Sequence, residues 1–303
     1  MTEGPMIFDR ALTRRRQRRA AALGPATFLL DRVAGDLAER LQAVMRQFDL
    51  AVDVGTPGEA TRAALAGLRS IGTLVAIGAS PDLAIRTNQM EKLVVADEEA
   101  LPLRDASVDL IVSALALQFV NDLPGALLQI RRALTPDGLF LAALVGGETL
   151  TELRQAFAAA ESDVEGGVSP RVAPFADLRD LGALLQRAGF ALPVADTDRL
   201  IVRYDTVFDL MHDLRRMGAT NALLDRRRTP LRRATLLRMA EIYARRFADA
   251  DGRVRATFEI VWLSGWAPDP SQQQPLRPGS AKTRLADALG TREISAGEKA
   301  ARK

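Results

Sequence analysis

The sequence predicts an α/β protein built on a doubly wound, mostly parallel sheet. Short apolar segments alternate with helical stretches between residues 50 and 145. The segments do not alternate strictly between apolar and polar residues, which is typical of strands that helices cover on both faces. Five such units in a row favour a doubly wound arrangement. The predicted strands are 51–54, 73–77, 92–95, 110–113 and 139–144.

Further elements are expected on both sides of this alternating region. Upstream, a basic helix or arm covers 7–20, and apolar residues recur at helical spacing over 29–45. Downstream, two helices are expected, and then two late strands that flank a mostly helical stretch. The downstream helices are 149–161 and 177–188, the late strands are 200–204 and 253–263, and the helical stretch between them is 205–247.

Three regions follow from this order of elements. Residues 1–28 are expected to form a basic N-terminal arm or helix. Residues 29–268 are expected to form the main domain, with a helical insert at about 205–250 that acts as a lid. The stretch 269–303 is rich in Pro, Gln, Ser, Gly and charged residues, so a flexible tail is expected there.

The composition restricts the possible chemistry. The chain has no cysteine, which excludes disulfides, thiolate metal sites and cysteine-ligated iron–sulfur clusters. His212 is the only histidine, so neither a two-histidine iron site nor a histidine zinc cage can form. No apolar run reaches the roughly 20 residues of a membrane span. The first nine residues lack a signal segment, and we therefore expect a cytoplasmic protein.

The net charge is +3, and basic residues cluster near the start of the chain, at 14–19. A solvated helix face is the simplest interpretation of this arginine run. Binding to anionic lipid or to an acidic partner is the second, and it would place the protein at the inner face of the cytoplasmic membrane. Nucleic acid is disfavoured because no aromatic stacking platform accompanies the run.

The segment 51–59 predicts a buried strand, a tight glycine loop and then a helix. It approaches the acidic-x-Gly-x-Gly-x-Gly pattern that binds S-adenosylmethionine, with Asp53 and Gly55 in place. Pro57, which has no backbone N–H, stands near the position of the second glycine. Gly58 fits the third position if the loop has lost one residue. An ordinary strand-to-helix turn has the same residue types, so the loop alone leaves both interpretations open.

The next two strand ends carry further candidates. Gly78 stands where an acid that binds the ribose hydroxyls is expected, and Asp82 is interpreted as a helix cap. Asp97 could accept a hydrogen bond from an adenine amino group, although a solvated acidic turn is the alternative. The string Asp-x-Glu-x-Leu-Pro that begins at Asp97, together with 105–113, is more specific than any single acid.

With these motifs, residues 50–145 resemble class I S-adenosylmethionine-dependent methyltransferases, in the branch that includes the malonyl-carrier-protein methyltransferases of biotin synthesis. Nearly the whole chain is similar to the methyltransferase-like assembly-factor family of respiratory complex I. A bacterial relative of that family's mitochondrial arginine hydroxylase is indicated. The late strands would then form the terminal antiparallel hairpin of the sheet. The segments that carry this similarity are 8–10, 117–124, 146–154, 169–171, 187–190, 217–222 and 265–268.

The resemblance implies S-adenosylmethionine as cofactor and a complex I subunit as protein substrate. It also implies substrate contacts at Gln118, Asn121 and Trp266, where family members often show His-Trp in place of Gln118-Phe119. The catalytic residues remain unassigned. The implied cofactor-binding residues are Asp53, Gly55, Thr56, Gly58, Asp97, Glu98 and Ser113.

Three functions are compatible with the sequence. The first is a complex I assembly factor that hydroxylates or methylates a subunit. The second is a methyltransferase of a small molecule or of malonyl carrier protein. The third is a non-catalytic assembly chaperone with a decayed cofactor site. Hydroxylation needs an oxidant, and the sequence contains no iron triad, no haem cysteine and no clear flavin motif.

Overall fold

A computed structural model describes residues 6–79, 92–273, 280 and 283–292. Its contacts divide the chain into two compact units, Met1–Pro268 and Asp269–Lys303. The second unit contains a short helix, α10 (Leu285–Leu289). The expected helix cap Asp82 lies outside the described residues.

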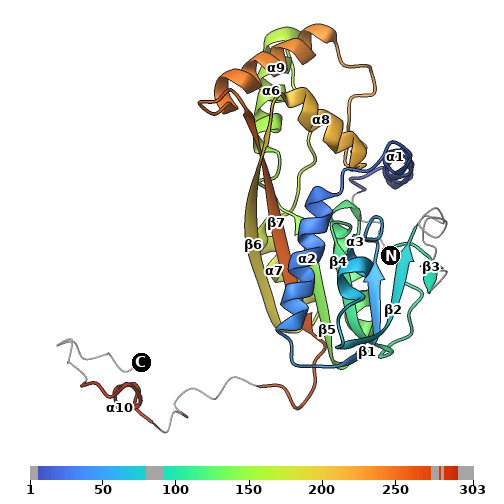
Figure 1. The fold of residues 1–303 in the computed structure, drawn as a ribbon, viewed down its shortest axis with the longest axis vertical. Helices are drawn as coiled ribbons and strands as arrows, with labels where there is room; N and C mark the ends of the chain where they lie inside the picture. Colours follow the sequence, from blue (N-terminus) through green and yellow to red (C-terminus); the bar gives the residue numbers. More distant parts are fainter. Residues whose placement is uncertain (1–5, 80–91, 274–279, 281–282, 293–303) are drawn as a thin grey trace. The chain divides into compact units, whose positions relative to one another are not determined.

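The first unit is organised around a seven-stranded sheet with the order β3-β2-β1-β4-β5-β7-β6 (Figure 1). The pairs among β1 to β5 are parallel, and β7 runs antiparallel to both β5 and β6. The predicted doubly wound sheet with a terminal antiparallel hairpin is therefore confirmed. The strands are β1 (Phe48–Val54), β2 (Ile71–Gly78), β3 (Leu93–Val95), β4 (Val108–Ala114), β5 (Leu134–Val145), β6 (Ala191–Tyr204) and β7 (Val254–Trp266).

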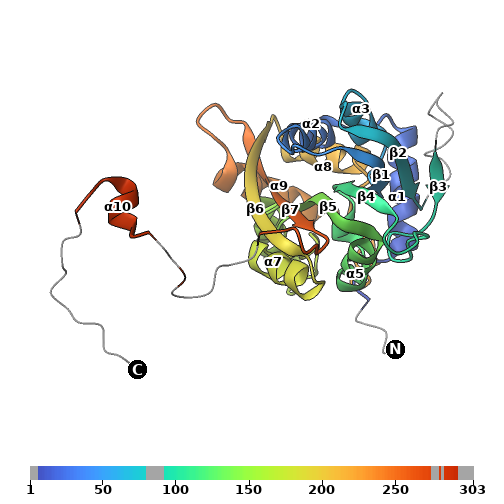
Figure 2. The ribbon, with the colours of Figure 1, turned by 90° about the horizontal axis from the view of Figure 1, so that it is seen from below.

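Helices cover both faces of the sheet. One face carries α2 (Phe28–Gln42) and α3 (Ala60–Leu65), and the other carries α5 (Leu123–Ala133) and α7 (Leu178–Arg187), as the view from below shows (Figure 2). Each face has its own apolar core, and strand residues alternate between the two cores. Burial on both faces explains why the parallel strands are almost continuously apolar.

A third group of helices lies beyond the carboxyl ends of the parallel strands (Figure 1). It consists of α6 (Thr151–Glu165), α8 (Val207–Arg216) and α9 (Arg233–Phe247), packed around the outer halves of β6 and β7. The buried Glu152 of α6 accepts hydrogen bonds from the backbone N (3.1 Å) and the Oγ1 (2.5 Å) of Thr257 in β7. Helices α8 and α9 come from the chain between β6 and β7, where the sequence predicts a helical insert.

Strand β6 begins at Ala191, well before the predicted start at residue 200. Its first part includes Pro193 and several polar residues, and much of it is exposed. Because β6 is an edge strand, a proline without an N–H donor and an exposed face are tolerated there. The sequence of this first part of β6 therefore lacks the apolar pattern of a buried strand. No helix among the described residues is long and apolar enough to cross a membrane.

Gly265 is required by the packing of the antiparallel hairpin. A Cβ added at this position would lie 2.9 Å from Cβ of Phe190, whose ring stacks on Phe140. We expect Gly265→Ala to lower the free energy of unfolding by about 1–3 kcal/mol. The matched control is Gly35→Ala in α2, which meets no atom within 4 Å and is expected to raise stability by about 0.5–1 kcal/mol. Urea denaturation measures the free energy of unfolding of both variants. Equal effects of the two substitutions would contradict the claim that packing requires glycine at position 265.

Candidate functional site

A cavity of about 380 Å³ opens at the carboxyl ends of the parallel strands. Residues at or just after the ends of the five parallel strands contribute to its wall: Gly55, Ala79, Glu98, Leu115 and Val145. In open α/β sheets, ligands bind outside the carboxyl ends of the strands, near the point where the strand order reverses. Here that point lies between β1 and β4. The cavity therefore occupies the position in which this fold binds ligands.

The loop after β1 supplies one side of the cavity. Gly55 and Gly58 both adopt left-handed backbone conformations, with φ of +73° and +74°. A Cβ on Gly55 would lie 2.8 Å from Cγ of Glu98, whereas a Cβ on Gly58 would meet no atom of the described residues within 4 Å. Gly55 thus permits close packing, and Gly58 leaves its backbone open. The structure brings three of the predicted cofactor residues, Gly55, Gly58 and Glu98, to the cavity wall.

Beneath this loop, buried polar side chains join β1 to β4. Thr56 Oγ1 donates a hydrogen bond to Asp53 Oδ1 (2.5 Å) and accepts one from the backbone N of Ala114 (2.9 Å). Ser113 Oγ donates to the carbonyl of Val54 (2.7 Å). Asp53, Thr56 and Ser113 were expected to bind cofactor, but they are buried and are absent from the cavity lining. Their contacts in this structure shape the loop.

The burial of Asp53 changes its titration. Its side chain is on β1, and the residue is only 2% exposed. Removal of the carboxylate from water raises the pKa of Asp53 to about 6, although the hydrogen bond from Thr56 and the charge of Arg62 act in the opposite direction. The loop is thus supported by a carboxyl group whose pKa burial raises well above its usual value.

The basic segment at the start of the chain forms α1 (Arg10–Ala22), which begins at its N-cap Asp9. Arg10 pairs with Asp97 (2.8 Å), Glu99 (2.7 Å) and Glu98, and Arg14 also pairs with Asp97. Burial acts to raise the pKa of Asp97, but the backbone N–H of Glu99 and the two arginines bring that pKa below its usual value. Asp97, the expected partner of adenine, therefore binds α1 in this structure and is absent from the cavity lining.

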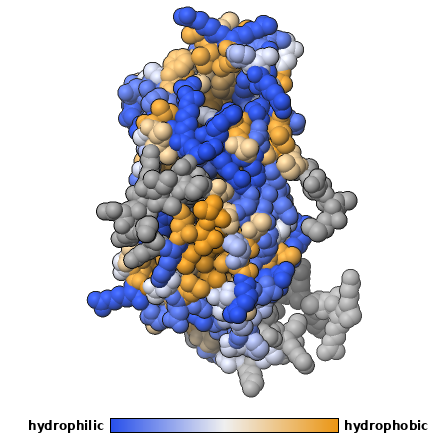
Figure 3. All heavy atoms as spheres, turned by 90° about the vertical axis from the view of Figure 1, so that its right-hand side faces the viewer, coloured by the Kyte–Doolittle hydropathy of each residue, from blue (hydrophilic) through white to orange (hydrophobic). Residues whose placement is uncertain are grey.

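Some arginines of the run at 14–19 contact the rest of the protein, and others are exposed to solvent. Arg14 lines the cavity, and Arg16 donates hydrogen bonds to the carbonyls of Thr220 (2.8 Å) and Asn221. Arg15, Arg18 and Arg19 are exposed, and Arg18 reaches the cavity rim. Figure 3 views the side of the molecule that carries α1, where hydrophilic side chains lie above an apolar patch.

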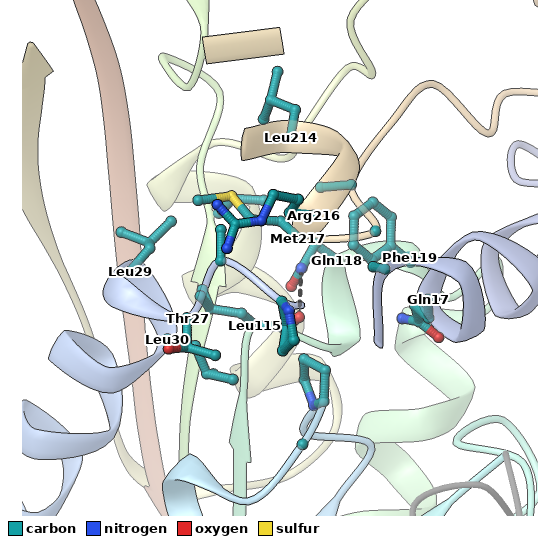
Figure 4. A pocket seen from close by; sticks show the side chains of 18 of the residues that line it. Gln17, Thr27, Leu29, Leu30, Leu115, Gln118, Phe119, Leu214, Arg216 and Met217 are labelled. Carbon is teal, nitrogen blue, oxygen red and sulfur yellow. Dashed lines mark hydrogen bonds between the residues drawn. The ribbon is translucent and has the colours of Figure 1, made fainter. Parts of the chain in front are cut away.

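The segment after β4 supplies the opposite side of the cavity. Leu115 has a φ of +52°, and a 3₁₀ turn, η1 (Leu117–Phe119), follows it. Gln118 lines the cavity, and its Nε2 donates a hydrogen bond to the carbonyl of Leu115 (2.7 Å, Figure 4). The ring of Phe119 packs between those of Phe8 (5.8 Å) and Phe175 (6.5 Å). The predicted substrate residue Gln118 is therefore at the cavity.

The other two predicted substrate residues, Asn121 and Trp266, do not line the cavity. Asn121 Oδ1 accepts hydrogen bonds from the backbone N of Ile7 (2.8 Å) and of Phe8 (2.7 Å), so it holds the segment that precedes α1. Trp266, the last residue of β7, pairs with Leu139 in the first half of β5, and the guanidinium of Arg46 lies 5.7 Å from its ring centroid. This is the end of the sheet opposite the cavity. Neither Asn121 nor Trp266 is among the residues that line the cavity, and their contact with substrate stays a prediction.

The residues that close the cavity were not predicted as site residues. They come from α1, α2, the segments after β5 and before α7, β7 and the end of α8 (Figure 4). Gly218 has a φ of +71°, and a Cβ there would lie 2.9 Å from Cα of Gln17, so α1 packs directly against the end of α8. In a sequence, a glycine just after a helix indicates that the helix ends there, but it does not indicate which other helix packs against that end. The closing residues include Gln17, Leu29, Leu30, Thr149, Leu150, Phe175, Leu214, Arg216, Met217, Ala219 and Phe258.

The cavity combines a largely apolar interior with a few charges. Its acids, Glu59 and Glu98, lie in or beside the glycine loop, and its cations are Arg14, Arg18 and Arg216. Among the residues that the structure describes, no group of three or more His, Cys, Asp or Glu side chains could hold a metal ion. The cavity therefore suits an organic ligand with limited polar contacts.

Comparison with known sequences gives consistent relatives. A family model described as a methyltransferase domain matches residues 52–142. The arginine-hydroxylase NDUFAF5, mitochondrial, of Danio rerio is 38% identical over 292 residues, which cover 94% of this chain and 90% of that protein. The Homo sapiens protein of the same name is 40% identical over 91% of this chain and 81% of its own length. A malonyl-[acyl-carrier protein] O-methyltransferase of Gallionella capsiferriformans is 33% identical over 87% of this chain and 93% of its own.

Solved structures share the fold at low sequence identity. A putative methyltransferase from Bacillus halodurans matches with a TM-score of 0.53 and 17% identity, over 77% of this chain and 99% of that one. The YcgJ protein of Bacillus subtilis has the same TM-score at 14% identity, over 77% and 98% of the two chains. These matches identify the methyltransferase fold, and at such identities they carry no information on substrate.

The raised pKa of Asp53 makes a prediction about stability. A carboxyl group whose pKa rises on folding contributes stability below its unfolded value of 3.8, and this contribution is lost as the pH passes the folded value of about 6. Relative to Asp53→Asn, the wild type should lose about 2–3 kcal/mol of unfolding free energy between pH 4 and pH 7. Chemical denaturation at a series of pH values measures this difference. If the free energy of unfolding depends on pH in the same way for both proteins, the raised pKa of Asp53 would be contradicted.

Proposed function

The chain belongs to the family of the arginine-hydroxylase NDUFAF5, and on this premise we propose that it binds S-adenosylmethionine and modifies an arginine of a partner protein. The observation that carries the proposal is the cavity at the carboxyl ends of the strands, with Gly55 and Gly58 in its wall. By the resemblance of the sequence, the partner is a subunit of respiratory complex I, and the modification aids assembly of the complex.

The residues of the cavity fit this cofactor. Its volume of about 380 Å³ suits a ligand of that size, and the open backbone at Gly58 allows close approach. Gly78 cannot supply the usual ribose acid, so Glu59 and Glu98 are the carboxylates available to accept hydrogen bonds from hydroxyl groups. When bound, S-adenosylmethionine supplies an electrophilic methyl group.

The chain itself would contribute enclosure and orientation. Helix α1 and the end of α8 cover the cavity, and Leu29, Leu30 and Phe258 make its wall apolar. An enclosed, apolar cavity excludes water and holds two reactants at a fixed distance, which are the main requirements of methyl transfer. Hydroxylation of arginine consumes an oxidant in addition, so analysis of the product distinguishes the two reactions.

A second candidate function is O-methylation of a carboxylate. Arg18 and Arg216 line the cavity, and a cation can bind a carboxylate substrate. Arg216 Nε donates to the carbonyl of Gly24 (2.7 Å), while Arg18 makes no ion pair with the described residues. The similarity to the Gallionella O-methyltransferase extends over most of both chains and supports this alternative.

Cofactor binding is tested by calorimetric titration with S-adenosylmethionine. The wild type is expected to bind, and Gly58→Ala is expected to bind about tenfold more weakly because the added Cβ would occupy space at the backbone that the cofactor is proposed to approach. Gly67→Ala is the matched control, since Gly67 has open space around it and no left-handed φ. Absence of binding at millimolar ligand would sink the proposal and favour a non-catalytic assembly chaperone.

The protein substrate is tested by deleting the gene and analysing complex I subunits by mass spectrometry. We expect one arginine to lose the mass of an oxygen atom in the deletion strain. Loss of the mass of a methylene group instead would identify methylation. Complementation with the wild type should restore the mass, and complementation with Gly58→Ala should restore it only partly. Normal complex I with an unchanged subunit would rule out this role.

A further inference from the structure

Gln118 holds a buried hydrogen-bond acceptor that nothing in the described part of the chain satisfies. Its Nε2 donates to the carbonyl of Leu115 (2.7 Å), and because a carbonyl can only accept, this bond fixes the orientation of the amide. The unpaired atom is therefore the oxygen, Oε1, which is inaccessible to solvent and has no partner among the residues that the structure describes. Buried polar atoms are nearly always paired, and an exception at a cavity wall points to a ligand.

The backbone around Gln118 is constrained. Leu115, the acceptor of the Gln118 amide, has a left-handed φ of +52°, although its side chain is large. Its N–H donates to the carbonyl of Ala143 in β5 (2.8 Å), so the sheet holds the residue in place. Such conformations persist only where the surrounding structure enforces them, and they concentrate at functional sites. The direction of the Gln118 side chain is thus set by the sheet.

Two further contacts relate Gln118 to the remainder of the cavity. Ala116 packs against the cofactor loop, since a Cβ on Gly55 would lie 3.1 Å from that of Ala116. Phe119 is held between Phe8 and Phe175. Gln118 is therefore anchored on both sides in a short turn at the cavity wall.

We propose that Gln118 binds the reactive group of the substrate by accepting a hydrogen bond from an N–H of that group. This inference rests on the proposed function, in which a guanidinium group supplies such N–H donors. The amide is uncharged, so it can orient a guanidinium without adding a carboxylate beside Glu98. Gln118 would then select substrates with N–H donors over carboxylates, which offer only acceptors.

The test compares the binding of two small probes by the full chain saturated with S-adenosylhomocysteine. Butylguanidinium carries N–H donors, and pentanoate has similar size but only acceptors. Gln118→Glu and Gln118→Met both remove the hydrogen bond to Leu115, but only the glutamate keeps acceptor oxygens. We expect Gln118→Met to weaken butylguanidinium binding about tenfold, and Gln118→Glu to retain it.

Several outcomes would overturn the inference. They are equal affinity of the wild type and Gln118→Met for butylguanidinium, no binding of that probe by the wild type, or preference of the wild type for pentanoate. The last result would support carboxylate methylation instead. Titration of the same proteins with S-adenosylmethionine keeps the two proposals separate. If the wild type does not bind the cofactor, the proposed function is refuted. If only the contact with substrate is affected, the two variants should bind the cofactor as the wild type does.

Discussion

The hydrogen bonds of Thr56 connect the two strands from which the cavity is built. One hydroxyl group bridges the carboxyl group of Asp53 in β1 and the backbone N of Ala114 in β4. The glycine loop leaves β1 directly above this bridge, and the strained turn at Leu115 leaves β4 beside it. Both walls of the cavity therefore depend on a buried polar contact that lies outside the cavity lining.

The cavity is closed by parts of the chain that lie far apart in sequence. The acids that follow β3 hold α1 through Arg10 and Arg14, and the glycine after α8 lets the two helices touch. Asp97, which the sequence places where it could face a ligand, instead pairs with both of these arginines of α1. Since these ion pairs are partly exposed, their strength depends on ionic strength more than that of the Asp53–Thr56 contact does.

Most of the fold could be predicted from the sequence because parallel strands that are buried on both faces are almost continuously apolar. The roles of polar residues were harder to predict. Asp53 and Ser113 carry the expected residue types, but only the packed sheet determines that their side chains are buried. Asp97 is paired by arginines from the start of the chain, a contact that no local pattern reveals. Trp266 ends a strand as Val54 does, yet β7 runs antiparallel to β5. Trp266 therefore lies at the end of the sheet opposite the cavity.

The docking of α1 also has a consequence for the order in which the protein is completed during synthesis. The helix leaves the ribosome before any of its partners, which include Asp97 in the middle of the chain and Thr220 and Asn221 much later. Its guanidinium groups must stay in water until those partners have been translated. A nascent chain that stops before the end of α8 therefore lacks Thr220 and Asn221, whose carbonyls accept hydrogen bonds from Arg16, and it also lacks the residues after α8 that close the cavity.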